Sequence, residues 1–281
     1  MQLQYSIYVG RCLNVSYLTS FFIYFSLLLQ VQYLKGQWSE ALPYAHAHND
    51  YAKCFRRPAF RAISYGCTSI EIDIFHYKDK LKIAHVPLFL SLRKEFESTY
   101  LKPLHDYYLS KGQYFKSKDQ KLILMLDFKR SAGSIYYLLR PVLDKYKGVL
   151  SYYDHGNWID GPIQILISGA KPYQEVFADS IQFMFLDGNP SDLDKEGFSA
   201  TFFPRISCSY RSLVRGKLDD AEMLAIKQLS QKVHDKGSSL RFWAVPNRIY
   251  LWKKLRELGV DWLQVDQLDK LKKFKKIKSS E

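Results

Sequence analysis

The sequence has too few cysteines for a disulfide framework or a cysteine-based metal site. Its four cysteines, Cys12, Cys54, Cys67 and Cys208, form no CxxC pair and have no histidine at ligand spacing. Cys67 and Cys208 border predicted strands, where a cysteine is typically a small buried residue. A Cys54–Cys67 bridge stays open as an alternative if the protein is exported.

The sequence also lacks a linker rich in glycine, proline or serine, so no internal boundary divides residues 39–281. With 21 Tyr and 18 Phe among 281 residues, the aromatic content is too high for a disordered chain. A hydrophobic fraction of 47% suits a single large core. We therefore predict one domain after residue 38.

Acidic residues are scarce relative to basic ones, which gives a net charge of +13. Part of this charge falls in the lysine-rich end, residues 270–278, and the rest favours anionic substrates or surfaces through its long-range field. No basic-aromatic motif of a nucleic-acid-binding module is present. We predict a small phosphodiester or phospholipid-derived partner and no nucleic acid, and the sequence leaves the oligomeric state open.

Residues 1–38 contain an apolar run over 17–29, with Arg11 before it and Lys35 after it. This arrangement is typical of an export signal, although no small-x-small cleavage site follows it. An N-terminal membrane anchor is an alternative, since about 20 apolar residues span a bilayer, and a buried helix is a third. We predict an exported protein, periplasmic, secreted or membrane-anchored, and we leave this segment out of the fold.

Beyond residue 40, apolar stretches of strand length alternate with helix-like stretches. The run 121–129 is apolar on both faces, as in a parallel strand buried on both sides. The repetition predicts an α/β fold, a single (β/α)8 TIM-type barrel, with a doubly wound open sheet as the alternative. The predicted strands cover residues 42–46, 69–75, 121–129, 162–168, 181–186, 201–207, 240–245 and 262–265.

Two carboxylates share one face of the second predicted strand. Glu71 and Asp73 project to one side of this strand, while its isoleucines project to the other. Adjacent carboxylates on an apolar strand repel each other and are costly to desolvate. A divalent cation, which prefers oxygen ligands, removes that cost. The alternative is a polar face that meets water.

Polar side chains collect where the predicted strands end, which in a barrel is where the chemistry lies. They are His46 and His48, then Glu71 and Asp73 with His85 on a hairpin return, Asp127 and Lys129, Ser168, Arg205 and Ser207, Trp243 and Asn247, and Asp266. This convergence indicates one site and not a set of scattered structural residues.

The order of these motifs resembles the phospholipase-C-like phosphodiesterase superfamily. That superfamily includes glycerophosphodiester phosphodiesterases, spider-venom-type sphingomyelinases D and a less characterised group with His-x-His-Asn-Asp. The resemblance extends from about Leu42 to Asp266. It rests on His46-Ala-His48-Asn49-Asp50, Glu71-Ile-Asp73, His85, Asp127-Phe-Lys129 and the tryptophan-bearing strand around Trp243.

The resemblance implies a one-metal phosphodiesterase site. Glu71, Asp73 and Asp127 would hold one divalent cation, Mg²⁺ or Ca²⁺, that orients a phosphate. Lys129 would add positive charge against the phosphate oxygens, and Trp243 would form an apolar wall beside the substrate. Asp127 stands where a glutamate is commoner, which resembles the sphingomyelinase D branch and leaves the substrate class open.

The resemblance also implies a pair of histidines acting as acid and base. One is His85, and the other is His46 or His48. The spacing to the following helix favours His46 slightly, and the choice stays open. The His-Arg-Gly and Glu-Asn-Thr motifs of glycerophosphodiesterases are absent. The phosphate-binding arginine of the first motif is therefore missing, and His48 or Asn49 would replace it.

We therefore predict a metal-dependent phosphoric diester hydrolase that cleaves a glycerophosphodiester or lysophospholipid-like substrate. One alternative is a zinc hydrolase of the amidohydrolase or the polymerase-and-histidinol-phosphatase type, which also begins with His-x-His. Such a site needs further histidines after the middle strands, and the predicted strands offer none there. The other alternative is a barrel that binds a phosphate or glycan without catalysis.

Overall fold

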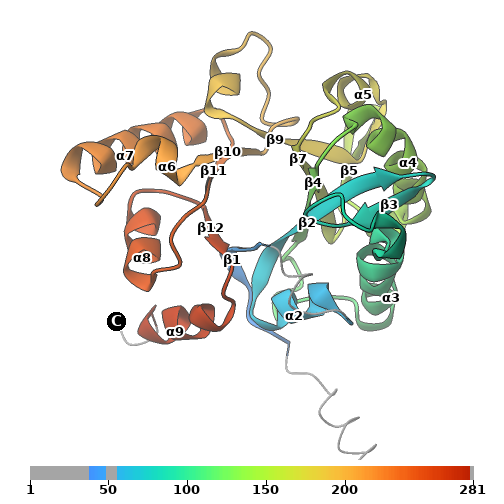
Figure 1. Cartoon of the computed structure of the whole chain (residues 1–281), viewed down its shortest axis with the longest axis horizontal. Coiled ribbons are helices and arrows are strands. Elements are labelled where there is room, and N and C mark those ends of the chain that lie inside the picture. Colours follow the sequence, from blue (N-terminus) through green and yellow to red (C-terminus); the bar gives the residue numbers. More distant parts are fainter. Residues whose placement is uncertain (1–37, 49–55, 279–281) are drawn as a thin grey trace, which may run out of the picture. The chain divides into compact units, whose positions relative to one another are not determined.

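The structure is a computed structural model of the chain, and it describes residues 38–48 and 56–278. Within these residues, eight parallel strands form a closed barrel with helices around it (Figure 1). The ring closes because β1 pairs in parallel with both β12 and β2. The prediction of a TIM-type barrel is confirmed, and the open-sheet alternative is wrong.

Most elements lie within two or three residues of their predicted bounds. The barrel strands are β1 (Leu42–Ala47), β2 (Cys67–Tyr77), β4 (Leu122–Phe128), β7 (Ile163–Gly169), β9 (Met184–Gly188), β10 (Arg205–Ser209), β11 (Ser239–Trp243) and β12 (Trp262–Val265). The predicted hairpin return is β3 (Lys80–Ile83), which pairs antiparallel with β2. The helices are α2 (Pro58–Ser64), α3 (Lys102–Lys111), α4 (Ala132–Lys145), α5 (Tyr173–Ala178), α6 (Tyr210–Leu213), α7 (Asp220–Asp235), α8 (Ile249–Glu257) and α9 (Asp269–Lys278). Short helical turns are η2 (Leu90–Leu92), η3 (Glu97–Leu101), η4 (Lys147–Val149) and η5 (Pro190–Asp194).

The strands divide their side chains between two environments. On β2, Ile70, Ile72 and Ile74 are fully buried in the large core between the barrel and its helices. Alternate positions of the strands face the barrel interior, where Met125 and Phe185 belong to a second, small apolar cluster. The predicted division of β2 between an apolar and a polar face is therefore present.

A small second sheet, absent from the sequence predictions, lies at the amino-terminal end of the barrel strands. It consists of β6 (Asn157–Ile159), β5 (Tyr152–Asp154) and β8 (Ile181–Gln182) in that order. The Trp158 ring lies 5.9 Å from the ring of Phe185, which faces the barrel interior. These strands are two or three residues long, too short for periodicity to reveal. The hairpin covers this end of the barrel, so the opposite end is the one left for a site.

The sixth barrel strand begins later than predicted. The amides of Phe202 and Phe203 bond to the Ser199 carbonyl and form a turn, so β10 starts at Arg205. Arg205 is 1% exposed, and its guanidinium lies 4.0 Å from the centre of the Trp262 ring. The prediction that Arg205 ends its strand at the barrel mouth is therefore wrong, because this side chain fills the interior.

Several predictions fall outside the described residues. The predicted signal or anchor over residues 1–38 does so apart from Trp38, as do Asn49 and Cys54. Among the described helices, none combines the length and the apolar character needed to cross a bilayer. Cys67 is fully buried and Cys208 partly so, as expected for small residues at strand ends.

Candidate active site

A cavity of about 640 Å³ opens at the carboxyl ends of the barrel strands. Every barrel strand contributes to it, either from its last residues or from the residue just beyond. The polar and aromatic side chains that line it are His48, Glu71, His85, Asp127, Lys129, Ser168, Lys171, Asp187, Asn189, Ser207, Arg241, Trp243 and Gln264. The cavity thus gathers most of the residues that the sequence places at strand ends.

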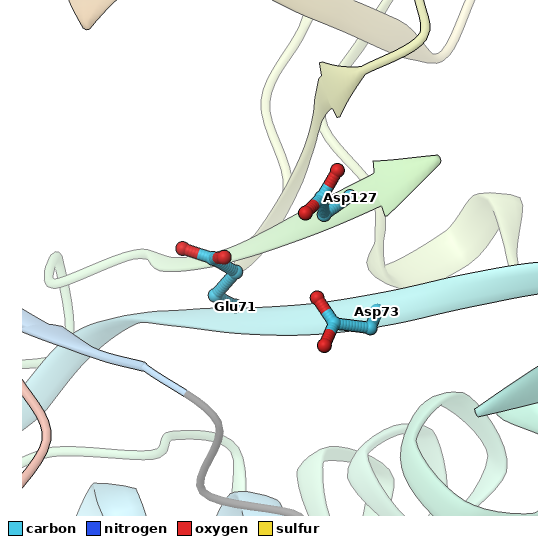
Figure 2. Close-up of side chains that lie close together, drawn as sticks. All are labelled: Glu71, Asp73 and Asp127. Atoms are coloured by element: carbon cyan, nitrogen blue, oxygen red, sulfur yellow. The ribbon is translucent and has the colours of Figure 1, made fainter. Parts of the chain in front are cut away.

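Three carboxylates lie close together at this end of β2 and β4 (Figure 2). Glu71, Asp73 and Asp127 each offer an oxygen within 4.8 Å of the others. The β2–β4 register causes this, because it sets Asp73 directly beside Asp127. Asp73 is 1% exposed, so it is the most buried of the three. An all-oxygen donor set of this size fits a hard divalent cation.

Lys129 places a positive charge among these carboxylates. Its ammonium lies 2.9 Å from Asp73 Oδ1 and also donates a hydrogen bond to Asp127. Burial disfavours the charged amine, but the bonds to Asp127 and Asp73 outweigh it and raise the pKa of Lys129. For Asp127 burial prevails over the lysine, and the pKa of this carboxyl is raised. The lysine therefore stays charged beside the carboxylate cluster.

An arginine from the seventh strand holds Glu71. Arg241 Nη2 donates to Glu71 Oε2 at 2.6 Å and to Gln264 Oε1 at 3.2 Å. Burial raises the pKa of Glu71, but Arg241 and the hydrogen bond from His46 outweigh it, so the pKa lies well below its usual range. The arginine of the His-Arg-Gly motif is absent, but Arg241, which the sequence did not single out, lines the cavity. Arg241 lies two positions before Trp243 on the same strand, so the two side chains share a face, and this spacing could have predicted Arg241 as a site residue.

His46 lies behind the cavity and not in its wall. The ring is fully buried, with Nδ1 2.8 Å from Ser69 Oγ and Nε2 3.0 Å from Glu71 Oε2. Burial, reinforced by the charge of Arg241, holds the pKa of His46 well below its usual value. A neutral ring with both nitrogens engaged serves to position Glu71. The sequence slightly favoured His46 as the acid–base residue, whereas the structure buries this ring away from the cavity.

His48 is the first-strand histidine that lines the cavity. Its Nδ1 lies 2.7 Å from Asp266 Oδ1, and its Nε2 lies 3.5 Å from Glu71 Oε1. Burial lowers the pKa of His48, but the hydrogen bond to Asp266 and the charge of Glu71 outweigh it, so the pKa is raised. Asp266 is held in turn by Asn247 Nδ2, 2.5 Å from its Oδ2.

His85 approaches the carboxylates from the hairpin return. It follows β3, and its Nδ1 lies 2.9 Å from Asp73 Oδ2. The Ala84 amide donates to the Asp73 carbonyl at 3.2 Å, which ties this part of the hairpin to β2. His48 and His85 therefore contact different carboxylates of the cluster, one on Glu71 and the other on Asp73. Each has one ring nitrogen anchored by an aspartate.

The middle strands add an aspartate that the sequence did not single out as a site residue. Asp187, near the end of β9, accepts hydrogen bonds from Ser207 Oγ at 2.6 Å and Ser168 Oγ at 3.1 Å. Trp243, at the end of β11, gives the cavity an apolar wall, and 47% of its area is exposed. The signal for Asp187 was its place at the end of the fifth strand, which carried no motif.

The zinc alternative finds no support in the part of the chain that the structure describes. There, the carboxylates Glu71, Asp73 and Asp127 form a candidate metal group without a histidine. His46 lies behind the cavity, and His105, His155 and His234 are not among the residues that line it. A zinc hydrolase site needs several nitrogen ligands around the ion.

Comparison with known proteins agrees with this geometry. The chain matches the AIM6-like phosphodiesterase domain over residues 40–187, more than half of its length. It is 26% identical over 260 residues to an altered inheritance of mitochondria protein 6 homolog of Arthroderma benhamiae, covering 80% of this chain and 81% of that one. It is 27% identical over 286 residues to altered inheritance of mitochondria protein 6 of Candida glabrata, covering 79% and 69%.

A solved structure, a glycerophosphodiester phosphodiesterase from Parabacteroides distasonis, matches with a TM-score of 0.49 and 14% identity, covering 87% of this chain and 100% of that one. The resemblance to phospholipase-C-like phosphodiesterases stated from the motifs is confirmed by the family match. The chain belongs to the AIM6-like phosphodiesterase domain family.

Proposed function

We propose that the chain is a metal-dependent phosphoric diester hydrolase that cleaves a glycerophosphodiester or a lysophospholipid-like substrate. One observation carries the proposal. His48 and His85 line the same cavity as Glu71 and Asp127, and the buried Asp73 offers an oxygen within 4.8 Å of both carboxylates. An acid, a base and an oxygen-rich cation site therefore meet in one space that a phosphodiester can enter.

Glu71, Asp73 and Asp127 would hold the cation, Mg²⁺ or Ca²⁺. Their oxygens lie within 4.8 Å of one another, and the set contains no sulfur or nitrogen ligand. Such a donor set suits a hard divalent ion. A bound ion of this kind would neutralise and orient the phosphate and stabilise negative charge in the transition state.

Three cationic side chains support binding of the anionic phosphate from the protein itself. Lys129 and Lys171 line the cavity, and Arg241 lies beside Glu71. Fixed positive charge in a partly enclosed site stabilises the charge that builds on phosphate oxygens during the reaction. Trp243 adds an apolar wall, which suits the glycerol or lipid part of the substrate.

The acid–base work falls to His48 and His85. One accepts the proton of the attacking hydroxyl, and the other donates a proton to the leaving alcohol. Asp266 and Asp73 accept hydrogen bonds from the Nδ1 atoms of the two rings. The Nε2 atoms, that of His48 being 3.5 Å from Glu71 Oε1, would then exchange protons with the substrate. His46 would not exchange protons with substrate, because it is buried behind Glu71.

Hydrolysis of a chromogenic aryl phosphodiester tests the proposal. We expect activity with Mg²⁺ or Ca²⁺ that a chelator abolishes, and a loss of roughly 10²-fold or more in His85→Ala. His234→Ala is the matched control, since His234 is also bonded to an aspartate, Asp261 at 2.7 Å, but does not line the cavity. Activity without metal, or equal activity of the two variants, would reject the mechanism.

A barrel that only binds phosphate or glycan predicts a different result. Such a protein would bind inorganic phosphate in the cavity and show no turnover with any metal.

An exported or membrane-anchored location, predicted from residues 17–29, is also part of this proposal. Cell fractionation of the full chain, with recovery only in the cytosol, would contradict it.

A further inference from the structure

The segment that follows His85 exposes an unusual amount of apolar surface. Val86, Leu88, Phe89 and Leu92 are exposed by between 44% and 82% of their area. Four large apolar side chains within seven residues form one surface segment, which we call the apolar loop, residues 86–92. Contiguous exposed apolar surface marks sites of interaction with other molecules, whereas scattered apolar side chains do not.

Hydrogen bonds hold the apolar loop in shape. The Leu88 amide donates to the Val86 carbonyl at 2.8 Å, and Arg93 Nε donates to the Leu88 carbonyl at 3.3 Å. Phe89 has φ +54, in the left-handed region, and its carbonyl accepts from the Leu92 amide at the start of η2. These bonds hold the backbone of the loop, while its apolar side chains stay in solvent.

The apolar loop is anchored next to the candidate active site and is followed by positive charge. It begins directly after His85, whose ring contacts Asp73 in the carboxylate cluster. At its other end, the Ile83 amide donates to the Lys94 carbonyl at 2.9 Å, and Lys82 Nζ donates to the Arg93 carbonyl at 3.0 Å. The exposed side chains of Arg93 and Lys94 come immediately after the apolar residues.

We propose that the apolar loop inserts into the surface of an anionic lipid bilayer. Apolar side chains flanked by basic ones are the combination that binds the headgroup and acyl-chain boundary, because burial and attraction to anionic lipids act together. The loop would bring His85 and the cavity mouth to the headgroups. That this delivers a membrane lipid as the substrate rests on the function proposed above.

Charge and size favour a bilayer over three other occupants of the apolar loop: a second copy of this chain, residues 1–38 of the same chain, and another protein. A second copy of this chain also carries a net charge of +13, so the basic flank would meet like charge. Residues 1–38 contain no aspartate or glutamate to pair with Arg93 and Lys94. Four side chains also form a contact smaller than the roughly 1,200 Å² that a stable protein interface buries in total.

Sedimentation with vesicles tests the proposal on the full chain. With phosphatidylcholine vesicles containing phosphatidylglycerol, the double variant Phe89→Ser, Leu92→Ser should partition at least about tenfold less than wild type. The matched control is Leu109→Ser, Tyr137→Ser, at positions 68% and 69% exposed on α3 and α4. Equal partitioning of the two double variants would overturn the proposal.

A local probe separates the apolar loop from any membrane binding by other segments. In Phe89→Trp, the fluorescence of the introduced tryptophan, taken as the difference from wild type, should be quenched by brominated lipids. The fluorescence of the tryptophan introduced in Tyr137→Trp should not be quenched. Lack of quenching at position 89 would overturn the proposal. So would a shift from dimer to monomer in the Phe89→Ser, Leu92→Ser variant without vesicles, since the loop would then bind a second copy.

The same variants separate this proposal from the proposed function. The Phe89→Ser, Leu92→Ser variant should hydrolyse a soluble aryl phosphodiester at the wild-type rate while losing vesicle binding. If no variant of the chain hydrolyses any phosphodiester, the proposed function fails, and vesicle binding still decides the role of the loop. If hydrolysis is found and vesicle binding does not depend on the loop, only the membrane proposal fails.

Discussion

Arg241 donates a hydrogen bond of 2.6 Å to Glu71, which lies 170 positions earlier in the chain. The two side chains are 3% and 8% exposed and meet inside the barrel, where His46 contacts the same carboxylate oxygen. This pair connects the seventh strand to the second across the barrel. It also fixes the position of one carboxylate of the candidate metal site.

Removal of Arg241 should therefore destabilise the fold. Arg241→Met leaves Glu71 buried without its main counter-charge, and breaking such a buried pair costs about 3–5 kcal/mol. Arg140→Met is the control, since Arg140 pairs with Asp179 and Asp144 outside the cavity in partly exposed positions, which are worth about 1 kcal/mol or less. Urea denaturation measures both. Equal losses would mean that Glu71 does not depend on Arg241.

The two histidines of the first strand should separate stability from activity. We expect His48→Asn to reduce aryl phosphodiester hydrolysis by roughly 10²-fold with little change in stability. His46→Asn should lower the free energy of unfolding by about 1–3 kcal/mol, because Ser69 or Glu71 loses a buried hydrogen-bond partner. Kinetics and urea denaturation of both variants check this. The opposite pattern would assign the acid–base role to His46.

Gly169 should be required for the position of Asp127. It has φ +68, and a Cβ there would lie 2.1 Å from Asp127 Oδ1. Gly169→Ala should therefore displace the carboxylate and weaken binding of Mg²⁺ or Ca²⁺, measured by titration calorimetry. Gly112→Ala shares the positive φ, +75, but its Cβ meets nothing within 4 Å. Both should lose about 1–2 kcal/mol of stability from backbone strain. Gly169→Ala should lose more, because its Cβ would also lie 2.5 Å from the Phe128 carbonyl oxygen, and only this variant should lose metal affinity.

Asp192 should make part of the stability depend on pH. Burial raises the pKa of this carboxyl, but hydrogen bonds from Lys195 at 2.6 Å and the Asn189 amide at 2.7 Å outweigh it and lower the pKa below 3.8. A depressed carboxyl pKa stabilises the fold above the unfolded value, and this contribution is lost as the pH falls through the folded value.

Asp192→Asn should therefore cost about 1 kcal/mol at neutral pH, the usual value of a helix cap. The difference from wild type should shrink as the pH falls below about 4. Urea denaturation as a function of pH provides the measurement. A difference that persists below that pH would exclude the carboxylate as its source.

The sequence determined the fold class and most of the strands. Runs such as residues 122–126 are apolar at every position, and this pattern depends only on a strand being covered on both faces. It missed β5 and β6 and placed β10 too early, because strands of three to five residues carry little periodicity. Aromatic residues before Arg205 resemble a strand, while their amides form a turn.

The sequence also determined the carboxylate pair, because Glu71 and Asp73 share a face in any strand. It could not choose between His46 and His48, which are two positions apart and therefore also share a face. The register of β1 with β2 decides between them. It pairs His46 with Ser69, one inward position below Glu71, and leaves His48 at the level of the cavity.

Only the tertiary structure brought Arg241 and Asp187 to the site and set Asp266 against His48. The sequence assigned no role to Arg241 or Asp187, and all three residues are far from residues 46–129 in the chain. Closure of the barrel through β1 and β12 sets Asp266 beside His48, and the interior of the ring sets Arg241 against Glu71. Local patterns reveal which way a side chain faces, whereas strand register and barrel closure decide which side chains meet.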